Sequence, residues 1–237
     1  MSIEVILLAA GQGRRLQPIT NIVPKCLVPI CGRPLLEIWL ENLNKIQVSR
    51  IHLNLHHFPE KVLNFINQNK YENIQTHYET ELLGTAGSIR RMLQNVDSKT
   101  VLIAHADNLT VFSLDSFLEK YFLRPKECIG TMMLFKTDRF ESCGIVDYDH
   151  ANSKILGYVE KPEKYVGDLA NGAVYLFDSS AIQERILKTD YDFSKDFVAR
   201  HFTELNGFVN DTLHMDIGTI ETFLDAQNAY LKASSDF

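Results

Sequence analysis

The chain has 237 residues, 45% of them hydrophobic, and 24 Lys and Arg against 30 Asp and Glu give a formal net charge of -6. These values fit a globular protein with a sizeable core, and the basic surplus of a nucleic-acid-binding protein is missing. No apolar segment has the length of a membrane span, and Glu4 followed by a short apolar run to Ala10 does not resemble a signal peptide. We therefore expect a cytoplasmic protein without a nucleic-acid or membrane partner.

Strand and helix patterns alternate through the first half of the chain. Strands are predicted at 3–8, 51–55, 74–78 and 101–104, and helices at 34–46, 59–66, 86–93 and 113–122. Pro34 and Pro59 suit first helical turns, and Ser113 suits an N-cap. Such alternation is typical of a mostly parallel, doubly wound sheet, whose ligands bind at the carboxyl ends of the strands.

After residue 128 the pattern changes. Strand-like segments follow one another with little helix between them, and two helices close the chain; these elements are predicted at 130–136, 144–147, 155–160, 173–177, 193–204 and 219–232. We find no repeat, low-complexity segment or flexible linker. The sequence therefore predicts one domain over residues 1–237, with two halves at 1–128 and 129–237.

The segment LLAAGQGRRLQPITNIVPKCLVPI, residues 7–30, places two glycines directly after the first strand. Three cationic side chains follow in the same segment: Arg14, Arg15 and Lys25. Gly11 and Gly13 form GxG, but Leu16 replaces the third glycine of the dinucleotide fingerprint, which disfavours an NAD-dependent oxidoreductase. Backbone amides and guanidinium groups suit phosphate oxygens, although a tight turn with solvated cations fits the same residues.

Two aspartates lie at the ends of predicted elements. Asp107, in VLIAHADNL, comes directly after a strand, and Asp216, in HMDIGT, precedes the turn that opens the last helix. Each fits a simple turn or helix cap when taken alone. As a pair they are suited to one Mg²⁺, which needs only one or two protein oxygens beside phosphate and water.

Three further motifs allow an ordinary structural interpretation. VEKP ends a strand with Glu160 and Lys161, which fit a surface ion pair, and NGAVYLF opens a strand with Asn171 and Gly172, which fit a turn. In ETELLGTAGSI, glycines and Thr85 precede a helix whose free amides suit phosphate or base edges, or a capped turn.

Histidine and cysteine do not form a metal motif. The candidates lack partners at metal-ligand spacing: His56, His57, His105, Cys26, Cys31, Cys128 and Cys143. We expect structural or surface histidines and, because cysteine is sparse, free thiols.

Taken in order, six motifs resemble those of the sugar-1-phosphate nucleotidyltransferases, and the resemblance covers nearly the whole chain: LAAGQGRRLQPIT…PKCLVPI, LLGTAGSI, HADN, VEKP, NGAVYLF and DIGTIETF. It implies a three-layer α/β/α sandwich with a Rossmann-like, mostly parallel sheet. The pattern is most similar to the short mannose-1-phosphate guanylyltransferases, and the short heptose- and N-acetylmuramate-1-phosphate enzymes look similar. The C-terminal β-helix of longer members is not expected, nor is acyltransferase activity.

The resemblance also implies a role for each matching residue. Contacts to the nucleotide are expected from Ala9, Ala10, Gly11, Gly13, Arg15, Lys25, Gly84, Thr85 and Asp107. Contacts to the sugar phosphate are expected from Gly144, Glu160, Lys161, Asn171 and Gly172. Asp107 and Asp216 would bind Mg²⁺, and the catalytic set would be Arg15, Lys25, Asp107, Lys161 and Asp216. Within it, Arg15 would hold the β- and γ-phosphates, Lys25 would bridge phosphates, and Lys161 would hold the sugar phosphate.

Four positions depart from the family pattern: Ala10 and Ala106 replace glycines, Arg14 replaces Thr or Ser, and Leu82 stands where pyrimidine-specific members often carry a base-reading Gln. Leu82 disfavours a pyrimidine base without proving a purine. Together with the resemblance to the short guanylyltransferases, it leads us to expect GTP, with mannose 1-phosphate or a related hexose or heptose phosphate. The alternatives are UTP or dTTP with a glucose- or muramate-type phosphate, and a non-catalytic nucleotide-sugar sensor. Because a sensor is free to lose the carboxylates and lysines that are present here, we expect an enzyme of nucleotide-sugar biosynthesis.

Overall fold

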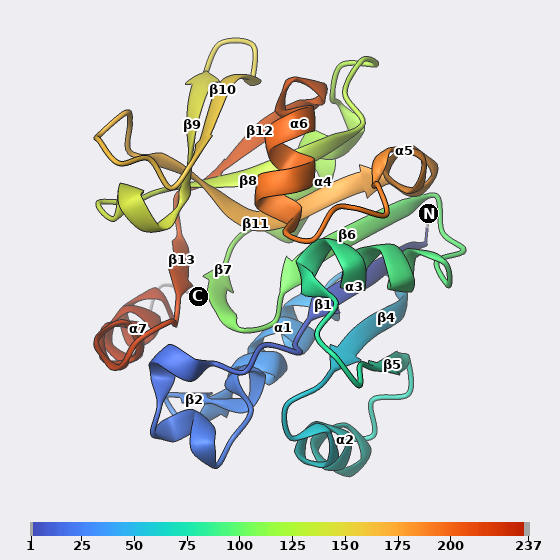
Figure 1. Cartoon of the computed structure of the whole chain (residues 1–237), viewed down its shortest axis with the longest axis vertical. Coiled ribbons are helices and arrows are strands. Elements are labelled where there is room, and N and C mark those ends of the chain that lie inside the picture. Colours follow the sequence, from blue (N-terminus) through green and yellow to red (C-terminus); the bar gives the residue numbers. More distant parts are fainter. Residues whose placement is uncertain (1, 235–237) are drawn as a thin grey trace.

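A computed structural model describes residues 2–234, and these form a nine-stranded mixed sheet covered by helices (Figure 1). The strand order is β5-β4-β1-β6-β11-β8-β12-β10-β9. Its first four strands are β1 (Ile3–Leu8), β4 (Val48–Leu55), β5 (Ile74–Tyr78) and β6 (Thr100–His105). The pairings among these four strands are all parallel, as the alternation of strands and helices in the first half predicts.

The second half of the sheet differs from the prediction. Its strands are β8 (Gly130–Lys136), β9 (Gly144–Asp149), β10 (Lys154–Glu160), β11 (Leu169–Asp178) and β12 (Leu205–Asn210). β11 is antiparallel to β6 and β8, and β10 is antiparallel to β9 and β12, whereas β12 is parallel to β8. The expectation of a mostly parallel sheet is therefore wrong for this half. The loops that join β8, β9, β10 and β11 contain no crossover helix, which parallel neighbours require.

Helices pack on the two faces of the sheet because successive strand residues point to opposite sides. Val5 and Leu7 of β1 belong to one core, with α1 (Leu35–Leu43), α2 (Pro59–Gln68) and α4 (Leu114–Phe122). Ile6 and Leu8 belong to the other core, with α3 (Gly84–Leu93), α5 (Ser179–Arg185) and the π-helix Phe193–Val198. The helix predicted at 193–204 is that π-helix followed by α6 (Ala199–His201) and a 3₁₀ turn, Phe202–Glu204.

A small two-stranded sheet joins the two halves. β7 (Asn108–Val111) pairs antiparallel with β13 (Leu213–Asp216), and α7 (Ile220–Ser234) follows β13. A third core, which contains Ile217 and Ala226, packs this region against Ile30 of the short strand β2 (Pro29–Ile30), which pairs with β3 (Arg33–Pro34). The register places Asp216 opposite Asn108, the residue after Asp107. The carboxylates of Asp107 and Asp216, which are about 110 residues apart in sequence, therefore become neighbours.

The NGAVYLF motif does not form the turn that its sequence suggested. Asn171 and Gly172 lie inside β11, and the ladder to β8 shifts between Asn171 and Tyr175. Ala173 adopts a left-handed φ of 52°, and its N–H donates to Asn171 Oδ1 at 2.9 Å. Such a bulge redirects side chains within a strand, and here it places the Asn171 amide beside Tyr175.

Other local predictions are confirmed. α2 begins at Pro59, and Ser113 caps α4 by accepting the N–H of Ser116. Within the described part of the chain, no helix combines the length and the apolarity that a membrane crossing requires.

Candidate active site

The site begins at the carboxyl ends of β1 and β6. The Ala106 N–H donates to Leu8 O at 3.0 Å, and a Cβ added at Gly11 would lie 3.7 Å from Asp107 Oδ2. The Ala9 N–H donates to Asn54 Oδ1 at 2.7 Å. The predicted glycine loop and the predicted metal carboxylate therefore lie at the same edge of the sheet.

Lys25 is the centre of the site. Its ammonium Nζ lies 2.9 Å from Asp107 Oδ2 and 3.1 Å from Asp216 Oδ1, and its side chain is only 8% exposed. Burial opposes the charge, but the two carboxylates outweigh it and hold the pKa of Lys25 above its usual value. For Asp107, burial is likewise outweighed, and Lys25 lowers the pKa of the carboxyl. Two carboxylates from different halves of the chain thus meet at one buried cation.

The glycine loop presents Arg15 to this centre. Gly13 has a φ of 61°, and a Cβ there would lie 2.7 Å from Thr20 Cγ2, so the tight turn requires glycine. The 3₁₀ turn Arg14–Leu16 follows, and Arg15 Nη2 lies 3.5 Å from Asp216 Oδ2 with its side chain 70% exposed. An arginine held this loosely is free to contact an incoming anion.

A pocket of about 260 Å³ lies beside Asp107. It is lined by Leu8, Ala10, Gly11, Asn54, Glu79, Leu82, Gly84, Thr85, Ser88, His105, Asp107 and Tyr191. Gly84 has a φ of 73°, and a Cβ there would lie 2.4 Å from Tyr191 O, so only glycine allows this close approach. The Phe193 N–H donates to Thr85 Oγ1 at 2.8 Å, so the Thr85 hydroxyl fastens the second half of the chain to the pocket wall.

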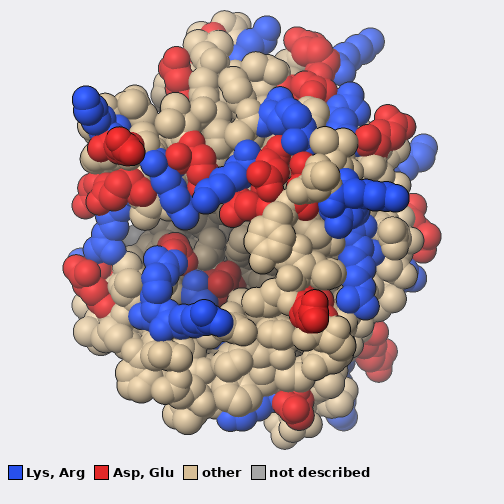
Figure 2. All heavy atoms as spheres, in the orientation of Figure 1, with Lys and Arg blue, Asp and Glu red and all other residues tan. Residues whose placement is uncertain are grey.

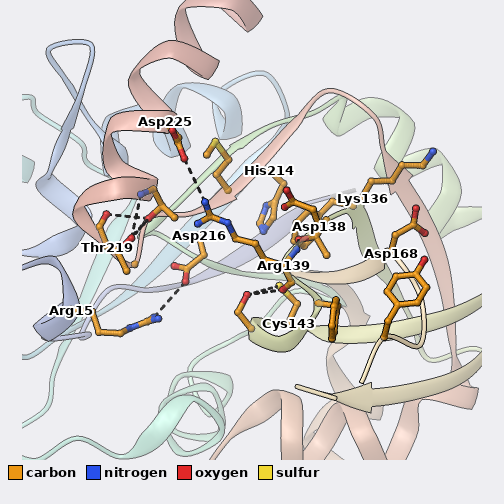
Figure 3. A pocket seen from close by; sticks show the side chains of 18 residues that line it. Arg15, Lys136, Asp138, Arg139, Cys143, Asp168, His214, Asp216, Thr219 and Asp225 are labelled. Atoms are coloured by element: carbon orange, nitrogen blue, oxygen red, sulfur yellow. Dashed lines mark hydrogen bonds and ion pairs between the residues drawn. The ribbon is translucent and has the colours of Figure 1, made fainter. Parts of the chain in front are cut away.

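A larger cavity, of about 960 Å³, includes Arg15 and Asp216 in its lining (Figure 3). Its walls come from four segments, namely the glycine loop with Arg15, the β8–β9 loop with Arg139, the β10–β11 loop with Asp168, and the β13–α7 region with Asp216. In Figure 3, Arg139 reaches across the cavity toward Asp225, and its Nη2 lies 3.6 Å from Asp225 Oδ2. The space-filling view has a hollow on this face with cationic groups on its rim (Figure 2).

The ion-pair centre lies between the two spaces. Asp107 lines the smaller pocket, whereas Asp216 and Arg15 line the larger cavity. Lys25 contacts both carboxylates. A cation held between carboxylates that line two different spaces can offset the mutual repulsion of phosphate groups bound in those spaces.

Three of the residues predicted on the sugar side lie together. The Tyr158 hydroxyl donates to Glu160 Oε2 at 2.6 Å, and a Cβ added at Gly144 would lie 2.7 Å from the same oxygen. Asn171 Nδ2 donates to the Tyr175 hydroxyl at 2.7 Å and reaches the Tyr158 hydroxyl at 3.4 Å. Glu160 is therefore held in place by a tyrosine that sequence reasoning did not single out.

The two other sugar-side residues are placed differently. Lys161 has a left-handed φ of 49°, its N–H donates to Cys143 O at 2.9 Å, and its side chain is exposed. Gly172 points to the opposite face of the sheet, where a Cβ would lie 2.5 Å from Met133 Cε. Gly172 thus packs against the core and is not beside Glu160.

The remaining histidines and cysteines have other partners. His56 Nδ1 lies 2.9 Å from Glu79 O, and His57 Nε2 lies 2.9 Å from Thr20 O. All four cysteines are free thiols, and burial raises the pKa of Cys26 to about 12. Among residues 2–234, no group of three or more His, Cys, Asp and Glu could hold a metal ion. A metal held by the protein alone therefore does not fit this site, whereas one shared with phosphates needs only the Asp107–Asp216 pair.

Comparison with known proteins agrees with this geometry. Residues 4–233 match the family model described as nucleotidyl transferase. The chain is 27% identical to a D-glycero-alpha-D-manno-heptose 1-phosphate guanylyltransferase of Aneurinibacillus thermoaerophilus, over 94% of this chain and 96% of the relative. It is 28% identical to the mannose-1-phosphate guanyltransferase beta-A of Xenopus laevis, over 97% of this chain but 65% of that longer protein.

Solved structures share the fold. HddC from Yersinia pseudotuberculosis, in a complex with GMP-PN, superposes with a TM-score of 0.77 at 23% identity, over 96% of this chain and 99% of that one. A putative glucose-1-phosphate thymidylyltransferase from Bacillus anthracis gives a TM-score of 0.78 at 20% identity, over 95% and 94% of the two chains. Both comparisons support a mixed α/β fold of the nucleotidyltransferase type.

Proposed function

Because this chain belongs to the nucleotidyl transferase family, we propose that it transfers a nucleoside monophosphate from a nucleoside triphosphate to a sugar 1-phosphate and releases pyrophosphate. The main support is Lys25, which contacts Asp107 and Asp216 between the two cavities. The smaller pocket would hold the nucleoside and the larger cavity the sugar. In this proposal residues 1–128 and 129–237 are the nucleotide and sugar-phosphate halves of one domain, with the α/β/α sandwich of the family.

The reaction needs alignment and charge neutralisation rather than a general base. An oxygen of the sugar phosphate forms a bond to the α-phosphorus, and the bond from that phosphorus to the bridging oxygen breaks. Pyrophosphate leaves with the bonding electrons. The attacking phosphate is already ionised near neutral pH, so no proton has to be removed. Lys25, Arg15 and Lys161 would neutralise the phosphates and align them.

Asp107 and Asp216 are the residues that would hold Mg²⁺. Their oxygens already converge on one cation, and two carboxylates with phosphate and water complete the usual coordination of this ion. When bound, Mg²⁺ supplies positive charge at the phosphates. Among the protein's own groups, Lys25 supplies the buried charge at the same place.

We infer that GTP is the nucleotide and that a heptose or mannose 1-phosphate is the acceptor. The two relatives carry guanylyltransferase names with these sugars. The cavity of about 960 Å³ admits an acceptor larger than a hexose phosphate, since about 16 non-hydrogen atoms need at most about 480 Å³ at the 30 Å³ that a water molecule takes in the liquid. UTP or dTTP is the alternative.

The direct test is pyrophosphate release over a grid of nucleoside triphosphates and sugar 1-phosphates with Mg²⁺. We expect release with GTP and a heptose or mannose 1-phosphate. Preference for UTP or dTTP would overturn the guanylyl assignment and leave the reaction class intact. If every pair remained inactive while nucleotide bound, a nucleotide-sugar sensor would be the better account.

Lys161→Ala should mainly weaken capture of the sugar phosphate. The side chain is exposed, and it begins the loop at the end of β10, beside Glu160. We expect KM for the sugar phosphate to rise by about tenfold, while KM for the triphosphate changes little, because a charge-assisted contact contributes roughly 1.5 kcal/mol. Arg15→Ala should instead impair handling of the triphosphate and pyrophosphate. Lys164→Ala, an exposed lysine of the same loop, is the matched control; an unchanged sugar-phosphate KM in Lys161→Ala would refute the assignment.

Tyr158→Phe tests whether the Tyr158 hydroxyl positions Glu160 for the sugar phosphate or only supports the fold. The change removes the hydroxyl that donates to Glu160 Oε2 and keeps the ring. We expect KM for the sugar phosphate to rise severalfold with KM for the triphosphate unchanged, since one hydrogen bond contributes about 1 kcal/mol. Tyr148→Phe, which removes a hydroxyl bonded to Gly207 O, should leave both values unchanged. An equal rise of both KM values in Tyr158→Phe would argue against a positioning role.

A further inference from the structure

Three buried titratable side chains form a row across the first half of the sheet. They are Glu4 of β1, His52 of β4 and His77 of β5, and none of them lines the two cavities described above. His52 Nε2 lies 2.7 Å from Glu4 Oε2, and His52 Nδ1 lies 3.0 Å from His77 Nε2. The proposed reaction uses none of these groups, so the row needs another explanation.

The contacts limit how many protons the two imidazoles can hold. A carboxylate only accepts hydrogen bonds, so His52 Nε2 carries a hydrogen toward Glu4. One hydrogen fits between His52 Nδ1 and His77 Nε2, because two N–H groups cannot both point into a gap of 3.0 Å. Even with a hydrogen on His77 Nδ1, the two rings hold three, one fewer than two imidazolium ions. Full protonation of both rings therefore requires that they separate.

The carboxylate end of the row is fixed in its ionised form. Burial raises the pKa of Glu4, but the hydrogen bonds from His52 and from two backbone N–H groups outweigh it and hold this pKa below its usual value. Those N–H groups belong to Asp97 and Ser98, and each donates to Glu4 Oε1 at 2.9 Å. Arg50 Nη1 lies 4.0 Å from Glu4 Oε2 and 3.4 Å from Asp97 Oδ2. Glu4 thus accepts from His52 throughout the neutral range.

The groups around His77 oppose a charge on its ring. Burial is the main cause that lowers the pKa of His77 to about 4, and the neighbouring His52 and Arg91 of α3 add to the shift. The Glu79 carboxylate acts in the other direction but does not outweigh them. The proton count and the electrostatics thus agree that the folded protein keeps the His77 ring neutral.

His77 lies on an edge strand whose end becomes the wall of the smaller pocket. In the described sheet, β5 pairs only with β4 (Figure 1). Two residues after His77, the Glu79 N–H donates to Leu55 O at 2.8 Å, and Glu79 Oε1 accepts from Asn54 Nδ2 at 2.9 Å. The segment 79–85 contributes several residues to the pocket lining. A movement of β5 away from β4 would therefore displace this wall.

We propose that the His52–His77 pair is a proton-operated switch on the nucleotide pocket. In neutral solution one hydrogen joins the two rings and helps to hold β5 against β4. When both rings become imidazolium ions, they part, β5 loosens, and the pocket wall that follows it loses support. The nucleotide part of this proposal rests on the function proposed above, whereas the effect on the sheet does not.

The direction of the pH effect follows from the two states of His77. An imidazole of the unfolded chain titrates near pH 6.5, whereas in the folded protein the pKa of His77 is about 4. Between these values the unfolded chain binds more protons, so the stability is fully present above pH 6.5 and is lost as the pH falls toward 4. From pH 7.5 to 5.0 this group should raise the unfolding equilibrium constant by about 30-fold.

The test compares native protein with His77→Gln, whose amide N–H can still donate to His52 Nδ1 but does not titrate. Denaturant unfolding at pH 7.5 and 5.0 should show the extra rise of about 30-fold in native protein and in the control His150→Gln, an exposed histidine, but not in His77→Gln. At pH 5.0, amide hydrogen exchange over 74–85 should be faster in native protein than in His77→Gln, with equal exchange in β6.

Nucleotide affinity is the third measurement. Between pH 7.5 and 5.0 the Kd for GTP should rise severalfold more in native protein than in His77→Gln, and the titration of the nucleotide itself is common to both. A failure of native protein to bind GTP at pH 7.5 would count against the proposed nucleotide; unfolding and exchange, which need no ligand, would still decide on the switch.

Two results would overturn the proposal. One is an equal pH dependence of unfolding in native protein and His77→Gln, and the other is equal exchange of residues 74–85 in the two proteins at pH 5.0. If His77→Gln did not fold, an NMR titration of the imidazoles of native protein would decide. His77 should then titrate well below pH 6.5, and titration near pH 6.5 with β5 still protected from exchange would refute the switch.

Discussion

Asp107→Ala or Asp216→Ala should lower kcat/KM by about a thousandfold, a loss of about 4 kcal/mol of transition-state stabilisation. The reason is geometric: oxygens of both carboxylates converge on the Lys25 ammonium, at 2.9 and 3.1 Å, between the two cavities. If both bind one Mg²⁺, either loss disables the same unit. The double variant should therefore be little worse than the worse single one.

Steady-state pyrophosphate release over a Mg²⁺ titration measures this effect. Asp115→Ala, an exposed carboxylate in the first turn of α4, is the matched control and should retain native activity. Circular dichroism establishes that each variant is folded. Near-native turnover in a folded Asp107→Ala or Asp216→Ala protein would exclude the pair from metal binding, and strictly additive losses would show that the two carboxylates act separately.

Sequence patterns predicted the first half of the fold better than the second. The parallel strands β1, β4, β5 and β6 alternate with long amphipathic helices, and both patterns are local. In β11, by contrast, the bulge at Ala173 depends on pairing with β8, so Asn171 looked like a turn residue. β7 and β13 have four residues each and pair across about 100 residues, which leaves too short a local pattern to detect.

In the candidate site, too, residues in local motifs could be predicted and residues defined by tertiary contacts could not. The motifs led to the Asp107, Asp216 and Lys25 cluster because each occurs in a recognisable segment. Tyr158 lies in no such segment. Its importance depends on its tertiary contact with Glu160. Side chains that orient a site are thus harder to identify from sequence than the groups they orient.

Lys25→Met should lower both turnover and stability, with different responses to Mg²⁺. Methionine keeps much of the buried stem but removes the ammonium. Without divalent metal, Asp107 and Asp216 then face each other with no buried cation. We expect the free energy of unfolding to fall by on the order of 2 kcal/mol, less than for a fully buried pair because Asp216 is 53% exposed. We also expect kcat to fall by about a hundredfold or more, since a charge at the phosphates is lost.

Mg²⁺ should then stabilise Lys25→Met more than it stabilises the native protein. In the variant the ion meets two uncompensated carboxylates, whereas in the native protein it meets carboxylates already paired with an ammonium. Binding to the folded state raises stability by mass action, so tighter binding gives a larger rise in Tm at the same Mg²⁺ concentration. Thermal unfolding in EDTA and in Mg²⁺ measures the difference, with Lys45→Met, an exposed lysine beyond α1, as the control. The kcat of the variant should stay low even where Mg²⁺ restores Tm, because the ion replaces the cation between the carboxylates but not the ammonium at the phosphates. Equal Mg²⁺-dependent shifts of Tm in the native and Lys25→Met proteins would mean that Lys25 and the metal do not share these carboxylates.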